Sequence, residues 1–95
     1  MAGERIYYFG RNPSMMALVG QQLSSAGYDP LPFRDELELA RALPTGDAKL
    51  LVIGSGVEDG PRLELKAMCE KYGVLVFENF GGPTSLVENL ERLLG

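Results

Sequence analysis

The sequence contains no histidine and no tryptophan, and only one of its 95 residues is cysteine. Without histidine, the chain cannot form a Ser–His or Cys–His catalytic pair or a metal site with histidine ligands. A single cysteine excludes an internal disulfide and any CxxC metal or redox motif. Because these common catalytic and metal-binding arrangements are excluded, we predict a protein without enzymatic activity, resident metal or cofactor.

Basic residues are also scarce, with nine Lys and Arg against thirteen Asp and Glu, which gives a net charge of −4 and a pI near 4.7. Nucleic acids and anionic membrane surfaces require clustered Lys and Arg, so we expect neither as a partner. No apolar run approaches the roughly 18 residues of a membrane span, and residues 1–4 lack a signal-peptide pattern. We therefore predict a cytoplasmic protein with one domain over residues 1–95 and a flexible N-terminus at residues 1–4.

Short apolar segments alternate four times with segments of helical periodicity, a pattern typical of repeated βα units around a parallel sheet. The predicted strands cover residues 5–9, 29–34, 50–53 and 74–77, the last continuing towards Phe80. The predicted helices cover residues 13–26, 35–43, 61–72 and 86–94.

Local signals define the first helix. Asn12 is a suitable N-cap, Pro13 fits the first helical turn, and Gly27 provides a left-handed stop. Gly20 lies inside this helix, where it costs about 1 kcal/mol relative to alanine. We therefore expect close packing of the helix on the sheet at Gly20.

The periodicity of the other helices predicts which residues face the core. In the second helix, which Asp35 caps and Pro44 ends, the inward residues are Leu37, Ala40 and Leu43. In the third and fourth helices the apolar stripes comprise Leu65, Met68, Cys69 and Tyr72, and Leu86, Leu90, Leu93 and Leu94, respectively. Cys69 is thus predicted to be a buried, unreactive thiol.

The strand sequences also predict the order of the sheet. Two prolines in residues 29–34 place this strand at an edge, since proline cannot donate to a β-ladder. Residues 50–53 are apolar throughout, as in a central parallel strand covered on both faces. With short, right-handed crossovers, we predict a three-layer α/β sandwich of Rossmann or flavodoxin-like type, with strand order 2-1-3-4.

In this arrangement three loops, residues 10–14, 54–60 and 78–85, meet at the carboxyl edge of the sheet, where such folds bind ligands. Helix N-termini and the Arg11 guanidinium there would suit a phosphate, a nucleotide or a carboxylate. Alternatively, these are ordinary tight turns, because neither GxGxxG nor GxxxxGK[ST] is present. The candidate ligand-binding residues are Arg11, Asn12, Ser14, Ser55, Gly56, Gly82, Thr84 and Ser85.

Acidic residues could gather at the same edge, namely Asp35, Glu36, Glu58 and Asp59, but their spacing does not indicate a metal site. The last strand would leave unpaired backbone groups at the opposite edge from residues 29–34, with only Glu78 and Asn79 to blunt it. We therefore predict that the outer strand and final helices contact a second copy, as a homodimer, or another protein.

Together, these segments resemble the receiver domain of response regulators. Residues 5–43 resemble the first strand, the long first helix ending in Ala-Gly-Tyr, the second strand and the short second helix. Residues 49–60 resemble the third strand and its loop, and residues 74–95 the final strand and helix. The resemblance implies a single receiver-like domain, although with one βα unit fewer than receivers have.

The chain departs from the receiver pattern where receivers carry their chemistry. Gly10 and Arg11 stand in place of the acid pair after the first strand, and Gly54 and Ser55 stand where the phosphorylated Asp is expected. The Lys near the end of the final strand is matched by Glu78 or Asn79. A receiver with these departures would have no Mg²⁺ site and no phosphoryl acceptor.

A second, local resemblance is to the C-terminal half of a small bacterial family of unknown function, at residues 66–73 and 82–86. The Asp-Cys and His positions of that family are absent, so this resemblance implies no activity. Two hypotheses remain. The chain is a non-catalytic regulatory or interaction module, or it is a small domain that binds a nucleotide or phosphorylated metabolite at the carboxyl edge of the sheet.

Overall fold

The computed structural model of the protein describes residues 4–54, 56–79 and 86–94. Four parallel strands form one sheet in the order β2-β1-β3-β4. Their bounds are Arg5–Phe9 for β1, Asp29–Phe33 for β2, Leu50–Gly54 for β3 and Leu75–Asn79 for β4. The predicted fold class and strand order are confirmed, with the proline-containing β2 at one edge and β4 at the other.

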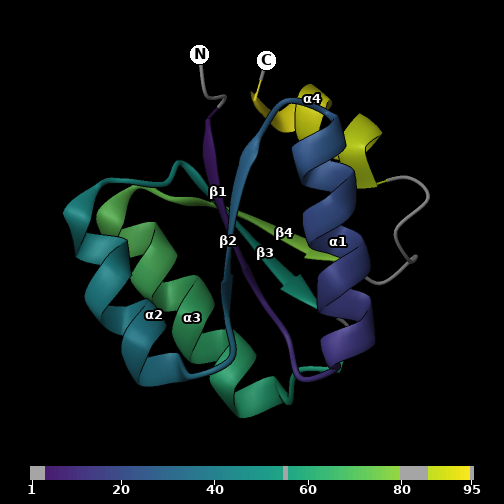
Figure 1. Cartoon of the computed structure of the whole chain (residues 1–95). Coiled ribbons are helices and arrows are strands. Elements are labelled where there is room, and N and C mark those ends of the chain that lie inside the picture. The colour runs from purple at the N-terminus through teal and green to yellow at the C-terminus, as the bar shows by residue number, and fades with distance from the viewer. Residues whose placement is uncertain (1–3, 55, 80–85, 95) are drawn as a thin grey trace.

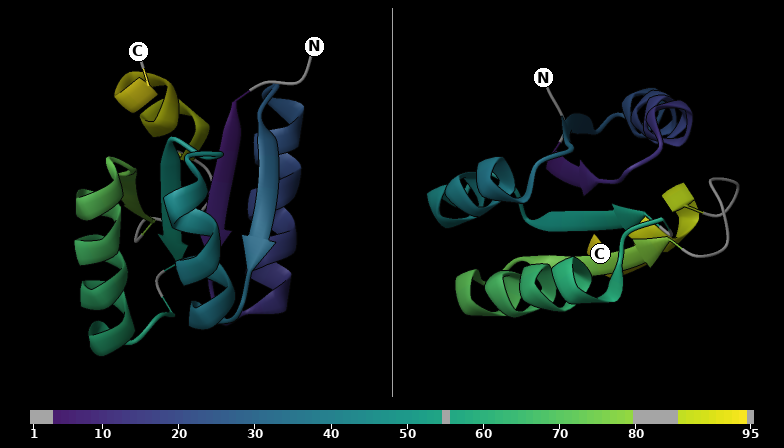
Figure 2. Two further views of the ribbon diagram at one scale, coloured as in Figure 1. Left: turned by 90° about the vertical axis from the view of Figure 1, so that its left-hand side faces the viewer. Right: turned by 90° about the horizontal axis from the view of Figure 1, so that it is seen from below.

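Helices cover both faces of the sheet (Figure 1). They are α1 at Pro13–Ser25, α2 at Glu36–Ala42, α3 at Asp59–Tyr72 and α4 at Leu86–Leu94, and a 3-10 turn at Leu43–Thr45 follows α2. Helices α2 and α3 lie on one face, and α1 and α4 on the other; α4 lies near the end where the strands begin (Figures 1 and 2). None of the helices in the described ranges is both long and apolar enough to cross a membrane.

The alternation of side chains along the strands produces two apolar layers. Tyr7 and Phe9 of β1 pack towards α2 and α3, whereas Ile6 and Tyr8 pack towards α1 and α4. Leu50 to Ile53 of β3 are buried at every position, because β3 pairs with a strand on each side and has helices over both faces. The core is thus split by the sheet into two halves.

The predicted N-caps of α1 and α2, Asn12 and Asp35, are confirmed, as is the left-handed glycine after α1. The Asn12 side chain accepts hydrogen bonds from two backbone N–H groups of the first turn of α1, at 2.9 and 3.3 Å. The Asp35 side chain accepts one from the backbone of α2, at 2.9 Å. Gly27 and Gly73, which follow α1 and α3, have φ values of +93° and +73°, in the left-handed region.

Gly20 also has the role that the sequence predicted. A Cβ atom added to Gly20 would lie 2.5 Å from the Tyr8 hydroxyl oxygen and 3.3 Å from Cζ of the same ring. No real side chain tolerates the shorter separation, so the absence of a side chain lets α1 approach β1 this closely.

Some predicted details are wrong. Leu37 was expected to face the core but is 69% exposed, whereas Leu39 is fully buried. With only seven residues, α2 has too few turns for its periodicity to select one face, and its contacts with β2 and α3 decide the orientation. Tyr72, expected on the buried stripe of α3, is 40% exposed because it occupies the last turn before Gly73. Leu93 of α4 is likewise 45% exposed, although Leu90 is buried as predicted.

The other differences concern element bounds. Helix α3 begins at Asp59, two residues before the predicted start at Pro61, since proline is tolerated in a first turn. Strand β4 begins at Leu75 rather than at residue 74 and extends to Asn79. The side chains of Leu86 and Leu94, and the residues 1–3 of the predicted flexible N-terminus, lie outside what the structure describes, as does Phe80.

Candidate functional site

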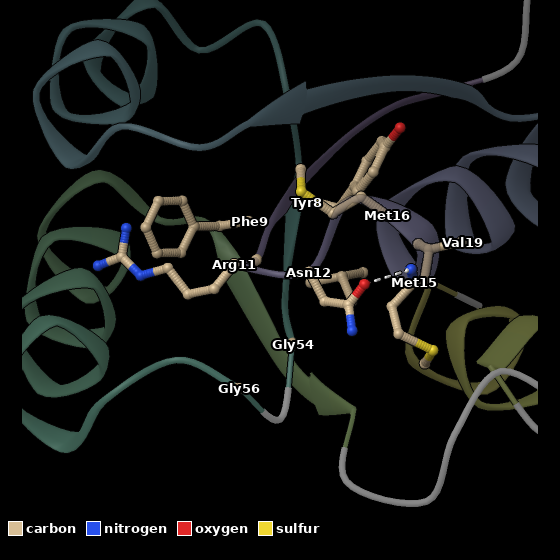
Figure 3. Close-up of a pocket in the computed structure, with 11 residues that line it drawn as sticks. Tyr8, Phe9, Arg11, Asn12, Met15, Met16, Val19, Gly54 and Gly56 are labelled. Atoms are coloured by element: carbon tan, nitrogen blue, oxygen red, sulfur yellow. Dashed lines mark hydrogen bonds between the residues drawn. The ribbon is translucent and has the colours of Figure 1, made fainter.

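A cavity of about 130 Å³ lies at the carboxyl end of β1 and β3, beside the start of α1 (Figure 3). Two of the three loops predicted to converge there, those after β1 and β3, do contribute to its lining. Most of the third, residues 80–85, lies outside the described residues. The cavity lining comprises Tyr8, Phe9, Gly10, Arg11, Asn12, Met15, Met16, Val19, Val52, Gly54 and Gly56.

Of the eight predicted ligand-binding residues, the structure brings Arg11, Asn12 and Gly56 together around this cavity. Ser14 is exposed on the first turn of α1 and is not among the lining residues. The remaining four, Ser55, Gly82, Thr84 and Ser85, lie outside the described residues. The ligand site therefore stays a prediction, and its chemistry depends on what the three placed residues contact.

Arg11 is already bound to carboxylates of the protein. Its Nε and Nη2 atoms donate to the two carboxylate oxygens of Glu58, each at 3.2 Å, and Nη2 also contacts the carboxylate of Glu36. Its Nη1 atom donates to the backbone carbonyl of Arg34 at 3.3 Å. The guanidinium carbon lies 5.0 Å from the centre of the Phe9 ring, and Figure 3 shows the side chain extending towards Phe9 and away from Met15.

The contact between Arg11 and Glu58 favours the charged form of both side chains. The hydrogen bond from Arg11 lowers the pKa of Glu58, and the same bond raises the pKa of Arg11. An anionic ligand at Arg11 would have to displace or approach carboxylates that repel it. Arg11 thus links the loops after β1, β2 and β3, and it is poorly placed to bind an anion from solution.

The N-terminus of α1 is also satisfied within the protein. Pro13 has no N–H group, and the N–H groups of Ser14 and Met15 donate to the Asn12 side chain. The N–H group of Met16 donates to the backbone carbonyl of Asn12 at 3.0 Å. The residues of the first turn, Pro13 to Met16, therefore offer an anion no unpaired N–H group.

The acidic residues predicted to gather here have separate partners. Glu36 and Glu58 both contact Arg11, Asp35 caps α2, and Asp59 pairs with Arg62 at 3.3 Å. Across the described part of the chain, no group of three or more His, Cys, Asp or Glu residues could hold a metal ion. On β4, Glu78 faces α3, where its carboxylate lies 3.5 Å from Nζ of Lys66.

Sequence reasoning missed the apolar part of the cavity. Met15 is half-buried at the lining, whereas the adjacent Met16 is buried, and Tyr8, Val19 and Val52 complete the apolar wall. The Met15–Met16 pair was the available signal, since two adjacent helical residues cannot both face the core. Most of the cavity wall therefore suits apolar groups better than a phosphate.

Two solved structures share this fold over nearly their whole length. The receiver domain of the hybrid histidine kinase CckA matches with a TM-score of 0.72 and 17% identity, over 96% of this chain and 99% of that one. The chemotaxis protein CheY4 of Vibrio cholerae matches with a TM-score of 0.65 and 14% identity, over 96% and 98%. The predicted resemblance to the flavodoxin-like receiver fold is thus confirmed.

No protein-family model matches the chain, and no curated protein matches it significantly in sequence. The local resemblance to the small bacterial family of unknown function therefore gains no support. Because the identities to the two solved structures are low, they establish the fold and leave the function to be argued from the residues of this chain.

Proposed function

We propose that the chain is a receiver-like regulatory module that works by binding protein partners and neither accepts a phosphoryl group nor catalyses a reaction. One observation carries this proposal. The positions where the receiver resemblance leads us to expect acidic residues, after β1 and at the end of β3, hold Gly10, Arg11 and Gly54, and all three line one cavity.

The contacts of Arg11 strengthen the argument. Phosphoryl transfer in this setting requires carboxylates that hold a divalent cation and an acceptor carboxylate within reach. Here a guanidinium occupies the loop after β1 and neutralises Glu36 and Glu58, the carboxylates nearest to it. A fixed positive charge at this point opposes the binding of Mg²⁺.

The outer strand offers a surface for a partner. Within the described residues β4 pairs with β3 alone, so one side of its backbone has no strand partner. Leu75 of β4 is 44% exposed, and Leu93 of α4 is 45% exposed. Unpaired strand edges and exposed apolar side chains are common features of protein contacts, so we propose that another protein binds along β4 and α4.

The alternative hypothesis, a site for a nucleotide or phosphorylated metabolite, is less well supported. Arg11, the main side chain expected to bind the anion, already binds the carboxylates of Glu36 and Glu58, and the first turn of α1 has no unpaired N–H group. The cytoplasmic location and the lack of a nucleic-acid partner stay proposals that rest on composition and net charge.

Intact-mass spectrometry after incubation with acetyl phosphate and MgCl₂ tests the proposal, with an unmodified receiver domain as positive control. We expect the control to gain a phosphoryl group and this chain to gain none. A hydroxylamine-sensitive phosphoryl adduct on this chain would overturn the proposal. A thermal-shift screen with nucleotides and phosphorylated metabolites tests the alternative, which a reproducible rise in Tm that Arg11→Ala abolishes would support.

A further inference from the structure

Helix α1 is unusual in this protein because it has no charged side chain. Residues 12–28, which include all of α1, contain no Asp, Glu, Lys or Arg, although 23% of the chain is charged. The other three helices each carry both signs: Glu36, Glu38 and Arg41 in α2, Asp59, Arg62, Glu64, Lys66, Glu70 and Lys71 in α3, and Glu88, Glu91 and Arg92 in α4. Burial does not explain this difference, because much of α1 is exposed.

The buried face of α1 consists of Met16, Val19 and Leu23, which pack on the sheet. On the remaining surface, Leu18 is 45% exposed, and Gln21 and Ser25 are also exposed. Helix α4 lies beside this surface (Figure 1). Between the two helices is a shallow groove of about 500 Å³, lined by Leu18, Gln21, Gln22, Ser25, Ala26 and Val87.

The groove also contains an unsatisfied hydrogen-bond acceptor. Oε1 of Gln22 is buried, and no donor within the described residues reaches it. Buried side-chain oxygens in folded proteins nearly always have a partner, and an unpaired one costs free energy. A donor from a second molecule would satisfy Gln22 only if the Gln22 side chain turned towards the groove.

We infer that two copies of this chain associate through α1, with the uncharged surface of one copy against the same surface of the other. Each copy carries a net charge of −4, so two copies repel each other least where neither presents a charge. A two-fold contact places identical surfaces together, which requires side chains that complement themselves. The amide of Gln21 both donates and accepts, and Leu18 supplies apolar area, so this surface meets that requirement.

This inference rests on the proposed function, because it names the surface that joins two copies of an interaction module, and it leaves the β4 edge free for another protein. The face is small, with one 13-residue helix and Val87 of α4. Small interfaces without charge pairs are weak, so we expect a dissociation constant on the order of 10–100 µM.

Sedimentation velocity with the full chain, from about 5 to 500 µM, tests the inference. We expect the wild type to pass from monomer to dimer over this range. Leu18→Glu and Gln21→Glu each place a charge in the contact, and each should raise the dissociation constant about tenfold or more. The matched control is Leu63→Glu, because Leu63 is 64% exposed on α3, on the other face of the sheet, and it should dimerise as the wild type does.

Added salt separates this contact from one made of ion pairs. Raising NaCl screens the repulsion between two negative molecules, so dimerisation should stay constant or strengthen. A dimer that dissociates in high salt would contradict the inference. A wild type that stays monomeric at the highest concentration would also overturn it.

A final variant, Leu75→Lys, tests the competing surface. If it abolishes the dimer while Leu18→Glu does not, the two copies associate through β4, and the inference about α1 is wrong. Circular dichroism of each variant shows whether a lost dimer reflects the changed surface or unfolding. If Leu18→Glu does not fold, Gln21→Glu, a near-isosteric change, takes its place in the test. The phosphorylation assay is independent of these results, so failure of the dimer and failure of the proposed function are distinguishable.

Discussion

Replacing Gly20 by alanine tests the close contact between α1 and Tyr8 of β1. In an unhindered helix interior, alanine is more favourable than glycine by about 1 kcal/mol. Here the new Cβ would lie 2.5 Å from the Tyr8 hydroxyl oxygen, and Tyr8 is buried, so its ring has little room to move. Forcing an extra carbon into a packed core costs about 1–3 kcal/mol. Gly20→Ala should therefore destabilise the fold by about 1 kcal/mol, which is the overpacking cost less the gain in helix propensity.

Removing the hydroxyl should reverse this effect. In the Tyr8→Phe background the nearest ring atom to the new Cβ is Cζ, at 3.3 Å, a separation that a shift of a few tenths of an ångström relieves. Gly20→Ala should then be neutral or stabilising by up to about 1 kcal/mol, which gives a coupling free energy of about 1–2 kcal/mol between the two substitutions.

Urea unfolding of the four proteins in this cycle, followed by circular dichroism, measures the coupling. A change of 1 kcal/mol corresponds to about 4–8 °C in Tm for a domain of this size, so thermal unfolding provides a second measurement. Gly60→Ala in α3 is the control, because a Cβ there meets nothing within 4 Å and should not destabilise the protein. If Gly20→Ala stabilises the wild type, or if the coupling is absent, the close packing of α1 on Tyr8 is not as described.

Two further predictions concern the core on the other face of the sheet. Leu39→Ala should lower the free energy of unfolding by about 2–5 kcal/mol because Leu39 is fully buried. Leu37→Ala should change it by about 0.5 kcal/mol or less because Leu37 is exposed. Equal effects of the two variants in urea unfolding would contradict the orientation of α2. Burial raises the pKa of the Cys69 thiol from 9.0 to about 11, so as the pH rises the unfolded chain loses this proton before the folded chain does. The contribution of this thiol to the free energy of unfolding should therefore be complete below pH 9 and fall by about 2–3 kcal/mol as the pH rises through 11. Cys69→Ala should have a smaller loss between about pH 9 and pH 11 in the same assay. An unchanged loss would assign it to other groups, such as Tyr8 and Tyr28, whose pKa values burial also raises.

Most of the fold was predictable because its determinants are local. Two prolines in one short strand place β2 at an edge, and an uninterrupted apolar strand places β3 at the centre. Asn12 and Gly27 mark the two ends of α1, and each does so through its own conformation or through contacts with residues next to it in the sequence. The orientation of α2 was not predictable in this way, since the choice between Leu37 and Leu39 depends on contacts with distant parts of the chain.

The candidate site was less predictable for the same reason. The sequence identifies Arg11 as a strong hydrogen-bond donor for an anion, next to a strand end. Its partners Glu36 and Glu58, however, are 25 and 47 residues away. Only the three-dimensional arrangement shows that these carboxylates occupy its donors. Asn12 poses a related problem, because one side chain was predicted both to cap α1 and to bind a ligand, and in the structure its oxygen serves the cap.

The contacts of Arg11 bear on how such a module could be regulated. A ligand shifts a protein between conformations only if it interacts differently with each of them. At the carboxyl edge, Arg11 holds the loops after β1, β2 and β3 together through ion pairs with carboxylates of the chain itself. The side chains of Arg11, Glu36 and Glu58 are 34–60% exposed. Exposed pairs of this kind contribute little to the free energy of folding. Their effect is instead to occupy the groups through which an anion or a cation would act at this edge, which is why the partner contacts that we propose lie elsewhere, on the uncharged surface of α1 and along β4.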